Sequence, residues 1–360
     1  MPTTITIDPV TRIEGHLSVE VTVDDVGGVQ QVVEARCSGT LFRGFEIMMT
    51  GRDPRDAGQY AQRICGVCPV SHAVAACETL EAAAGVAPAD NGRIQRNLVL
   101  GANYLQSHLL HFYHLSLVDF VDTSGLLDGA PWAPRYQAPD LLTGAVADDL
   151  VGHYLAAFEM RRRAHQMGAL FAGKLPCVAS FVPGGCTEPV TAERVAEFRT
   201  LLTELRAFVD AVYLPDANLL ASLFPGWSAL GAGPGNLLAF GVFDLDPTGA
   251  SQLLPGGRRT GGVAGDVDVA LIGEELRFGW YDPAGSGANP AQGITVPDAD
   301  AAEGYSWLKA PRYDGAPHEL GPLARLKVNG LYAGGVSVMD RIVARAEESK
   351  LIADAMDGWL

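Results

Sequence analysis

The first 35 residues alternate between apolar and polar positions. The segments TITID (4–8) and HLSVEVTVDDVGGVQQVVEA (16–35) place apolar side chains at nearly every second residue, which is the period of a strand with one buried face. Gly27 and Gly28 separate two of these runs, and a Gly-Gly pair is typical of a tight hairpin turn. The pattern predicts strands and a hairpin across residues 3–35.

After residue 53 the apolar residues recur at three- and four-residue spacing, which is typical of amphipathic helices. Asp53 can cap a helix that Pro54 opens. Longer helices are predicted at about 92–121, 148–172, 190–222 and 336–357. Between residues 225 and 335 the chain is rich in Gly and Pro, and only short β-prone pieces remain, such as GVFDL (241–245) and ELRFGWY (275–281).

These periods predict an α+β fold with a central helical bundle, an N-terminal β-hairpin region and short peripheral sheets. There is no internal repeat, and we interpret residues 1–360 as a single large domain. Its expected parts are a β-rich segment at 1–50, a helical core at 51–222, a loop- and β-rich segment at 223–335 and a C-terminal helix at 336–360.

The composition is that of a globular, acidic protein. Apolar residues make up 48% of the chain and charged residues 19%, which suits a folded core and not a disordered chain. Lys and Arg number 26 against 42 for Asp and Glu, so the formal net charge is −16. An acidic chain without a basic run is poorly suited to binding a phosphate backbone, and we expect no nucleic-acid partner.

The sequence shows neither a targeting signal nor a membrane span. The N-terminal residues MPTTITIDPV contain neither a basic nor an apolar signal region, so we expect no secretory signal of the chain's own. The longest uncharged run, residues 217–243, contains too much Gly and Pro for a membrane span. We therefore expect no transmembrane segment.

The strongest chemical signal is RICGVCPVSH at residues 63–72. If a helix begins at or near Cys65, then Cys65, Cys68 and His72 lie within an arc of about 60°. Spacing alone leaves a metal site, a redox pair and chance core cysteines open, and we favour metal. Four further cysteines have no partner at motif spacing, and we expect them to be small buried residues: Cys37, Cys77, Cys177 and Cys186.

Five motifs together resemble a known family. They are RIEGH (12–16), FRGFE (42–46), RICGVCPVSH (63–72), SHLLHFYHLSLVD (107–119) and GPLAR (321–325). Their order and approximate spacing resemble those of the large subunit of nickel-iron hydrogenases. The resemblance spans essentially the whole chain, and its specificity comes from the combination of motifs.

The resemblance implies a role for five residues. Cys65 and Cys68 would be thiolate ligands of a nickel-iron centre, with Cys68 bridging nickel to an iron that also carries carbonyl and cyanide groups. His72 would donate a hydrogen bond to a ligand sulfur, and we favour this role over that of a satisfied core histidine. Glu14 would relay protons. Without the resemblance, the sequence favours a surface pair of Glu14 with Arg12. Glu46 would help to bind Mg²⁺.

The motif at 107–119 contains His108, His111 and His114. Three imidazoles at a spacing of three could in principle bind zinc. In the resembled family they belong to a packed helix beside the active site, so we favour packing and hydrogen bonding. Ser107 stands where some relatives carry an Asp near the bimetallic pocket.

One departure from the family pattern is large. The family supplies two more nickel thiolates from a second Cys-x-x-Cys near the C-terminus, and the printed sequence contains only the pair at Cys65 and Cys68. We expect the second pair to lie on a missing segment or a separate polypeptide; the remaining alternative is that the site has been abandoned.

Two classes of function follow from the resemblance. The first is the catalytic subunit of a nickel-iron hydrogenase, an oxidoreductase for H2 ⇌ 2H⁺ + 2e⁻ to which this chain contributes half of the thiolates. The alternative is a nickel-free scaffold related to respiratory quinone oxidoreductases, or an inactive fragment. Cysteine spacing for an iron-sulfur cluster is absent from the sequence, so we expect an iron-sulfur small subunit as partner. The complex would be cytoplasmic, or periplasmic or membrane-associated through export with that subunit.

Overall fold

The computed structural model describes residues 1–129 and 140–360, which form two compact units. Unit 1 contains Met1–Arg52 and Asp268–His318, and unit 2 contains Asp53–Val267 and Glu319–Leu360. Each unit therefore joins segments that are far apart in the sequence. The single-domain interpretation stays a prediction, because compactness alone does not measure independent folding.

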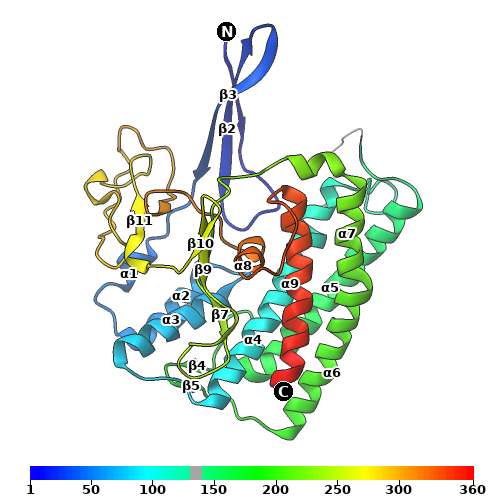
Figure 1. Cartoon of the computed structure of the whole chain (residues 1–360), viewed down its shortest axis with the longest axis vertical. Helices are drawn as coiled ribbons and strands as arrows, with labels where there is room; N and C mark the ends of the chain where they lie inside the picture. Colours follow the sequence, from blue (N-terminus) through cyan, green and yellow to red (C-terminus); the bar gives the residue numbers. More distant parts are fainter. Residues whose placement is uncertain (130–139) are drawn as a thin grey trace. The chain divides into compact units, whose positions relative to one another are not determined.

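Unit 1 contains the expected N-terminal hairpin. A three-stranded antiparallel sheet has the order β1 (Thr3–Ile7), β2 (Leu17–Val26), β3 (Val29–Gly39), and the β2–β3 ribbon is blue in Figure 1. Gly27 and Gly28 form the turn with φ of 68° and 88°, a left-handed conformation that glycine adopts without steric cost. The hairpin predicted from the alternating pattern is confirmed.

The rest of unit 1 is short elements and loops. They are α1 (Phe45–Met49), β11 (Ile272–Glu275) and β12 (Ala310–Tyr313), with β11 and β12 paired antiparallel. The loop before α1 is anchored by Phe42, whose ring stacks on Trp307 at 4.7 Å between centroids. The β-prone segment ELRFGWY forms mainly turns and isolated bridges at Gly279 and Tyr281, so its prediction as a strand is wrong beyond Glu275.

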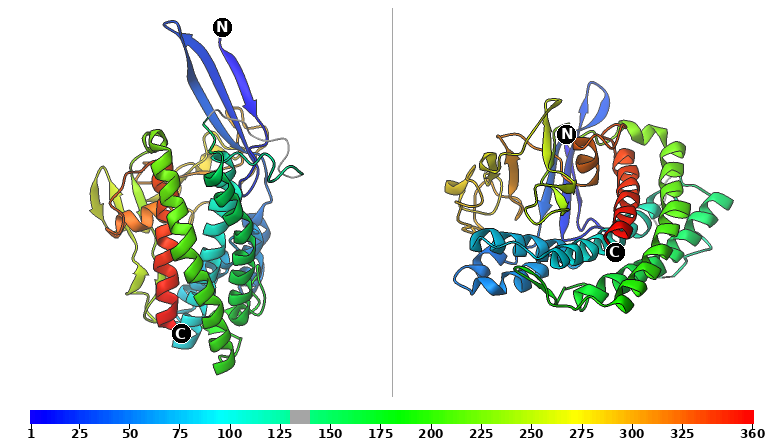
Figure 2. Two further views of the ribbon diagram at one scale, coloured as in Figure 1. Left: turned by 90° about the vertical axis from the view of Figure 1, so that its right-hand side faces the viewer. Right: turned by 60° about the horizontal axis from the view of Figure 1, so that its bottom comes forward.

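Unit 2 is built on long helices that run side by side (Figures 1 and 2). Its helices are α2 (Ala57–Ala61), α3 (Pro69–Ala84), α4 (Asp90–Leu109), α5 (Ala145–Ala172), α6 (Ala192–Phe208), α7 (Leu214–Leu223), α8 (Pro322–Val328) and α9 (Val338–Trp359). Helix α4 contacts α5 and α9, and α9 also contacts α6 and α7. The four long predicted helices are confirmed to within a few residues.

Two of these predicted helices contain a π-helical turn. Residues Leu110–Ser116 continue α4 in this form, and Val209–Tyr213 join α6 to α7. Hydrophobic spacing reveals the helical run but not the extra residue that a π-turn inserts. Asp53 caps as expected, since its side chain accepts a hydrogen bond from the Arg55 N–H at 2.9 Å, but the turn that it opens, Pro54–Asp56, is a 3₁₀ turn.

Short strands complete unit 2. Three small antiparallel sheets pair β4 (Phe181–Val182) with β5 (Gly185–Cys186), β7 (Val242–Asp244) with β8 (Gln252–Leu254), and β6 (Leu237–Ala239) and β10 (Val263–Gly265) with β9 (Gly257–Thr260). Strand β7 confirms the prediction for GVFDL. The sheets are peripheral pieces, and the helices carry the core.

The core of unit 2 lies between the helices. Leu105, Phe112, Leu150, Phe171 and Leu202 are each at most 1% exposed, and burying one such side chain contributes about 1.5–3 kcal/mol.

Helix α9 approaches α4 closely at Gly101, where an added Cβ would lie 2.6 Å from Met356 Sδ. A larger residue at this position would have to displace the flexible Met356 side chain from the helix contact.

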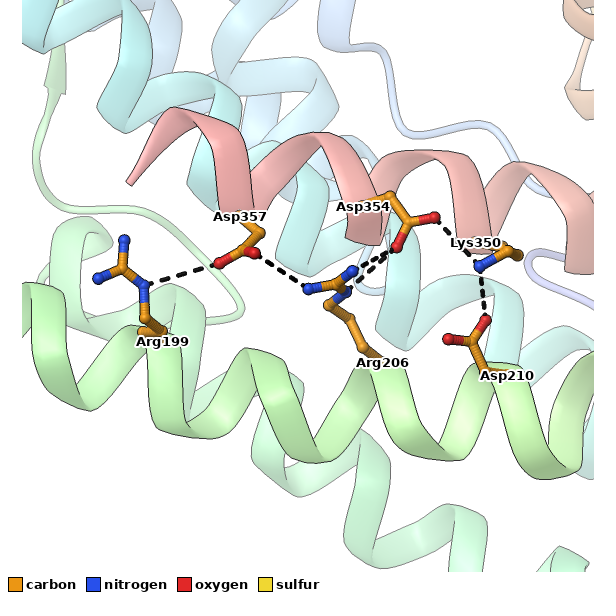
Figure 3. A network of polar contacts seen from close by, with 6 residues as sticks. All are labelled: Arg199, Arg206, Asp210, Lys350, Asp354 and Asp357. Atoms are coloured by element: carbon orange, nitrogen blue, oxygen red, sulfur yellow. Dashed lines mark hydrogen bonds and ion pairs between the residues drawn. The ribbon is translucent and has the colours of Figure 1, made fainter.

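Polar contacts fix the outer side of α9 to α6 and the π-turn after it (Figure 3). Arg206 donates to Asp354 at 2.7 Å and to Asp357 at 3.1 Å, and Lys350 donates to Asp210 at 2.8 Å. These side chains are partly exposed, so each ion pair contributes at most about 1 kcal/mol.

Candidate metal centre

The C-x-x-C turn of unit 2 precedes α3. Cys65 is extended, with φ −136° and ψ 134°, and Cys68 is the residue before α3, which begins at Pro69. Proline favours the first helical position because its missing N–H would lack an intrahelical partner there. The expectation of a helix beginning at or near Cys65 is therefore wrong, and Cys65, Cys68 and His72 do not share one helical face.

A turn, and not a helix, brings the two sulfurs together. The structure pairs Cys65 with Cys68 as a disulfide, with Cα atoms 5.4 Å apart. The Cys68 N–H also donates a hydrogen bond to Cys65 Sγ at 3.1 Å. Both residues are half-buried. Once reduced, two adjacent thiolates can bind one soft metal ion, so the donor set fits half of a nickel site.

The turn is held by a residue that lies outside the C-x-x-C motif. Gln106 of α4 donates from Nε2 to the Val67 carbonyl at 2.9 Å, across 39 residues of sequence. Nothing in the sequence distinguishes Gln106 from the other amide residues that α4 buries, such as Gln95 and Asn103. Among residues 1–129 and 140–360, no group of three or more His, Cys, Asp or Glu side chains forms a complete metal site.

His72 lies in the first turn of α3. Its backbone N–H donates to the Cys68 carbonyl at 3.5 Å, and the residue is half-buried. Burial lowers the pKa of its imidazole, which favours the neutral ring at pH 7. Its hydrogen bond to a ligand sulfur stays a prediction.

Glu14 belongs to unit 1. It is exposed in the loop between β1 and β2, beside Arg12 and Gly15, which have φ of 55° and 100°. Glu14 therefore lies outside a strand, whereas the alternative considered from the sequence was a surface pair of Arg12 and Glu14 on a strand. Its role as a proton relay stays a prediction.

Glu46 of unit 1 lies in α1 and faces an ammonium group. Lys309 Nζ is 3.1 and 2.9 Å from the two Glu46 carboxylate oxygens, 2.9 Å from Glu274 Oε2 and 2.8 Å from Thr295 Oγ1. These oxygens are of the hard type that Mg²⁺ prefers, but here Lys309 supplies the positive charge. The sequence gave no sign of this contact, because Lys309 is 263 residues from Glu46.

The three histidines of the 107–119 motif have separate partners. His108 donates from Nε2 to Glu348 at 2.7 Å, His111 Nδ1 lies 3.4 Å from Ser116 Oγ, and His114 Nε2 lies 3.2 Å from the Tyr154 carbonyl. Burial lowers the pKa of all three imidazoles. The predicted role in packing and hydrogen bonding is confirmed.

Glu348 is 0% exposed and is also bound by Arg325 of the GPLAR motif. Arg325 Nε and Nη2 lie 2.6 and 2.8 Å from its two oxygens. Burial alone would raise the pKa of Glu348, but the hydrogen bonds and charge of Arg325 and the His108 hydrogen bond together lower it to about 2. The pair is a buried, fully ionised contact between α8 and α9.

The remaining cysteines differ in burial. Cys77 is buried and Cys177 and Cys186 are half-buried, whereas Cys37 on β3 is exposed, so the prediction of a buried residue is wrong for Cys37. The sheet of unit 1 leaves that position uncovered. Burial raises the pKa of the Cys77 thiol to about 11 and that of Cys186 to about 12, which makes both poor nucleophiles at neutral pH.

Comparison with known proteins identifies the family. The family model described as nickel-dependent hydrogenase matches residues 43–138 and 128–356, and a HoxL-like model matches residues 4–33. The chain is 42% identical to the periplasmic [NiFeSe] hydrogenase large subunit of Desulfomicrobium baculatum, over 99% of this chain and 74% of that protein. It is 31% identical to the hydrogenase-2 large chain of Escherichia coli, over 94% of this chain and 70% of that one.

Solved structures agree with the sequence comparison. The Ni-Fe-Se hydrogenase of D. vulgaris Hildenborough in the reduced state superposes with a TM-score of 0.94 at 42% identity, covering 100% of this chain and 79% of that one. This confirms the mixed helical and short-sheet fold. None of the described helices combines the length and apolar composition that a bilayer crossing requires. The chain belongs to the nickel-dependent hydrogenase family and is a catalytic large subunit of that family.

Proposed function

We propose that Cys65 and Cys68 are two of the thiolate ligands of the nickel-iron centre that the family implies. The observation that carries this proposal is the adjacency of their sulfurs at the end of a short turn, with the Cys68 N–H aimed at Cys65 Sγ at 3.1 Å. When bound, a nickel-iron centre with carbonyl and cyanide on its iron supplies the site for heterolytic cleavage of H2. In this assignment the sulfurs of Cys65 and Cys68 would hold the centre.

Further side chains would orient the ligands of this centre, move protons and bind a divalent ion. The half-buried imidazole of His72, neutral at pH 7, can donate to a ligand sulfur and fix its orientation. Glu14 takes the proton released from a cysteine thiol and passes it outward, since a carboxylate can be both acceptor and donor. Glu46 and Glu274 would supply hard carboxylate oxygens for Mg²⁺. To bind there, the divalent ion must displace the ammonium group of Lys309.

Two further thiolates are proposed to come from a C-terminal segment outside the printed sequence, in line or as a second chain. The printed sequence contains one C-x-x-C, and it aligns with 74% of the D. baculatum large subunit. Two thiolates alone do not provide the soft, four-sulfur environment that favours nickel. The 360-residue chain expressed alone should therefore contain far less than one nickel.

Metal analysis of the 360-residue chain beside the completed one tests this assignment. Nickel should rise toward one per chain when the missing segment is added, and Cys65 and Cys68 should then become protected from thiol reagents. Cys65→Ser in the completed enzyme should lose nickel, whereas the control Cys37→Ser should keep it. Stoichiometric nickel in the short chain would show that its site is completed by other ligands. A completed chain without nickel would favour the nickel-free scaffold.

The partner and the compartment follow from the same chemistry. Electrons leaving a buried metal centre need further redox cofactors, so we propose an iron-sulfur small subunit with a large obligate interface. The D. baculatum relative is named periplasmic, which supports export together with that subunit over a cytoplasmic complex. Cell fractionation with and without the small subunit tests the location, and full H2 turnover by a stable monomer would contradict the need for a partner.

A further inference from the structure

Two hydrogen bonds meet on one peptide group inside the C-x-x-C turn. Gln106 Nε2 donates to the carbonyl oxygen of Val67 at 2.9 Å. The N–H of Cys68 donates to Cys65 Sγ at 3.1 Å. The Val67 carbonyl and the Cys68 N–H are the two ends of the same amide.

Because a peptide group is planar and trans, its C=O and N–H point in opposite directions and turn together. A donor that fixes the Val67 oxygen therefore also fixes the direction of the Cys68 N–H. Gly66 in the turn has no Cβ to restrict rotation of its own backbone, so a hydrogen bond from outside the turn adds to the restraint that the Cys65–Cys68 contact gives. Accepting one hydrogen bond also polarises the amide and strengthens the bond that it donates.

A longer contact from α5 favours the same orientation of the Gln106 amide. Arg161 Nη2 lies 3.5 Å from Gln106 Oε1, and an arginine can only donate. The Gln106 oxygen therefore faces Arg161, and its nitrogen faces Val67. Gln106 is 2% exposed, so water offers it little competition for either contact.

We infer that Gln106, held by Arg161, is a positioning residue that aims the Cys68 N–H at the Cys65 sulfur through the Val67–Cys68 peptide. A hydrogen bond to a ligand sulfur withdraws charge from it and tunes the metal that it binds. The use of this contact in catalysis rests on the proposed function. The geometry itself is a property of the metal-free chain and can be tested without nickel.

The test uses NMR of the full chain labelled with ¹⁵N-cysteine. The six cysteines give six amide signals, and the measurement is made on the oxidised chain, in which Cys65 and Cys68 are paired. In Gln106→Met and in Gln106→Glu the Cys68 amide should exchange with D2O at least tenfold faster, and its proton signal should move upfield. The signals of the four unpaired cysteines should stay in place.

Gln95→Met is the matched control, because Gln95 is another buried amide of α4 and donates to the Glu188 carbonyl at 2.8 Å. It should lower the melting temperature without a selective change at Cys68. Gln106→Glu keeps the shape of the side chain and replaces Gln106→Met in the test if that variant does not fold. Arg161→Met should give an increase in Cys68 amide exchange between those of wild type and the Gln106 variants.

Equal exchange of Cys68 in wild type and both Gln106 variants would overturn the inference. So would a uniform change of all six signals, or the same change in Gln95→Met. The nickel analysis tests a separate claim. If the completed chain holds one nickel but the Cys68 amide is unaffected in the Gln106 variants, only the positioning role is rejected.

Discussion

Glu348→Gln removes one charge from the buried contact between α8 and α9 and leaves the volume of the side chain unchanged. Glu348 is 0% exposed and accepts from Arg325 at 2.6 and 2.8 Å and from His108 at 2.7 Å. The variant leaves the Arg325 guanidinium without its carboxylate. Breaking one side of a buried ion pair costs about 3–5 kcal/mol.

The pKa gives a second measure of the same contact. The pKa of Glu348 falls from 4.5 to about 2, and at about 1.4 kcal/mol per pKa unit this corresponds to about 3 kcal/mol. A carboxyl whose pKa is lowered by folding stabilises the fold above its unfolded pKa, and this contribution is lost as the pH falls through the folded value. The advantage of wild type over Glu348→Gln should therefore be full above about pH 5 and should shrink toward pH 2.

Urea denaturation of both proteins at several pH values measures this difference. Glu347→Gln is the matched control, because burial raises the pKa of Glu347, so neutralising it should cost little or nothing. Replacing both partners, as in Arg325→Met with Glu348→Met, should recover most of the loss. A cost below about 1 kcal/mol, or one that is constant between pH 5 and pH 2, would refute the reasoning.

Three further outcomes are expected. In the completed enzyme, Glu14→Gln should keep the metal but lose most H2 turnover and hydrogen-deuterium exchange, since it removes the titratable group; unchanged exchange rates would leave Glu14 a structural residue. Arg206→Ala should cost about 1 kcal/mol of unfolding free energy at low salt and almost nothing in about 1 M NaCl; a salt-independent loss would instead indicate packing of the Arg206 stem. Lys309→Met leaves Glu46 and Glu274 facing each other, so its melting temperature should fall and added Mg²⁺ should restore it; Lys309→Arg, the control, should not respond to Mg²⁺, and an equal response of both would contradict the competition between the ammonium and the divalent ion.

The sequence by itself determined the elements and the family. Alternation with Gly27 and Gly28 predicted the β2–β3 hairpin, and apolar spacing predicted the long helices, because both signals depend on residues a few positions apart. The pair Cys65 and Cys68 was identified for the same reason. The combined motifs then identified the nickel-iron hydrogenase resemblance, which the comparisons confirm.

The tertiary structure alone decided how the candidate site is built. Helix α3 begins at Pro69, so a turn and not a helical face joins the two sulfurs. Gln106 reaches that turn across 39 residues, and Lys309 reaches Glu46 across 263. Contacts at such separations leave no periodic trace in the sequence, because they form only when packing of the apolar faces has brought the segments together.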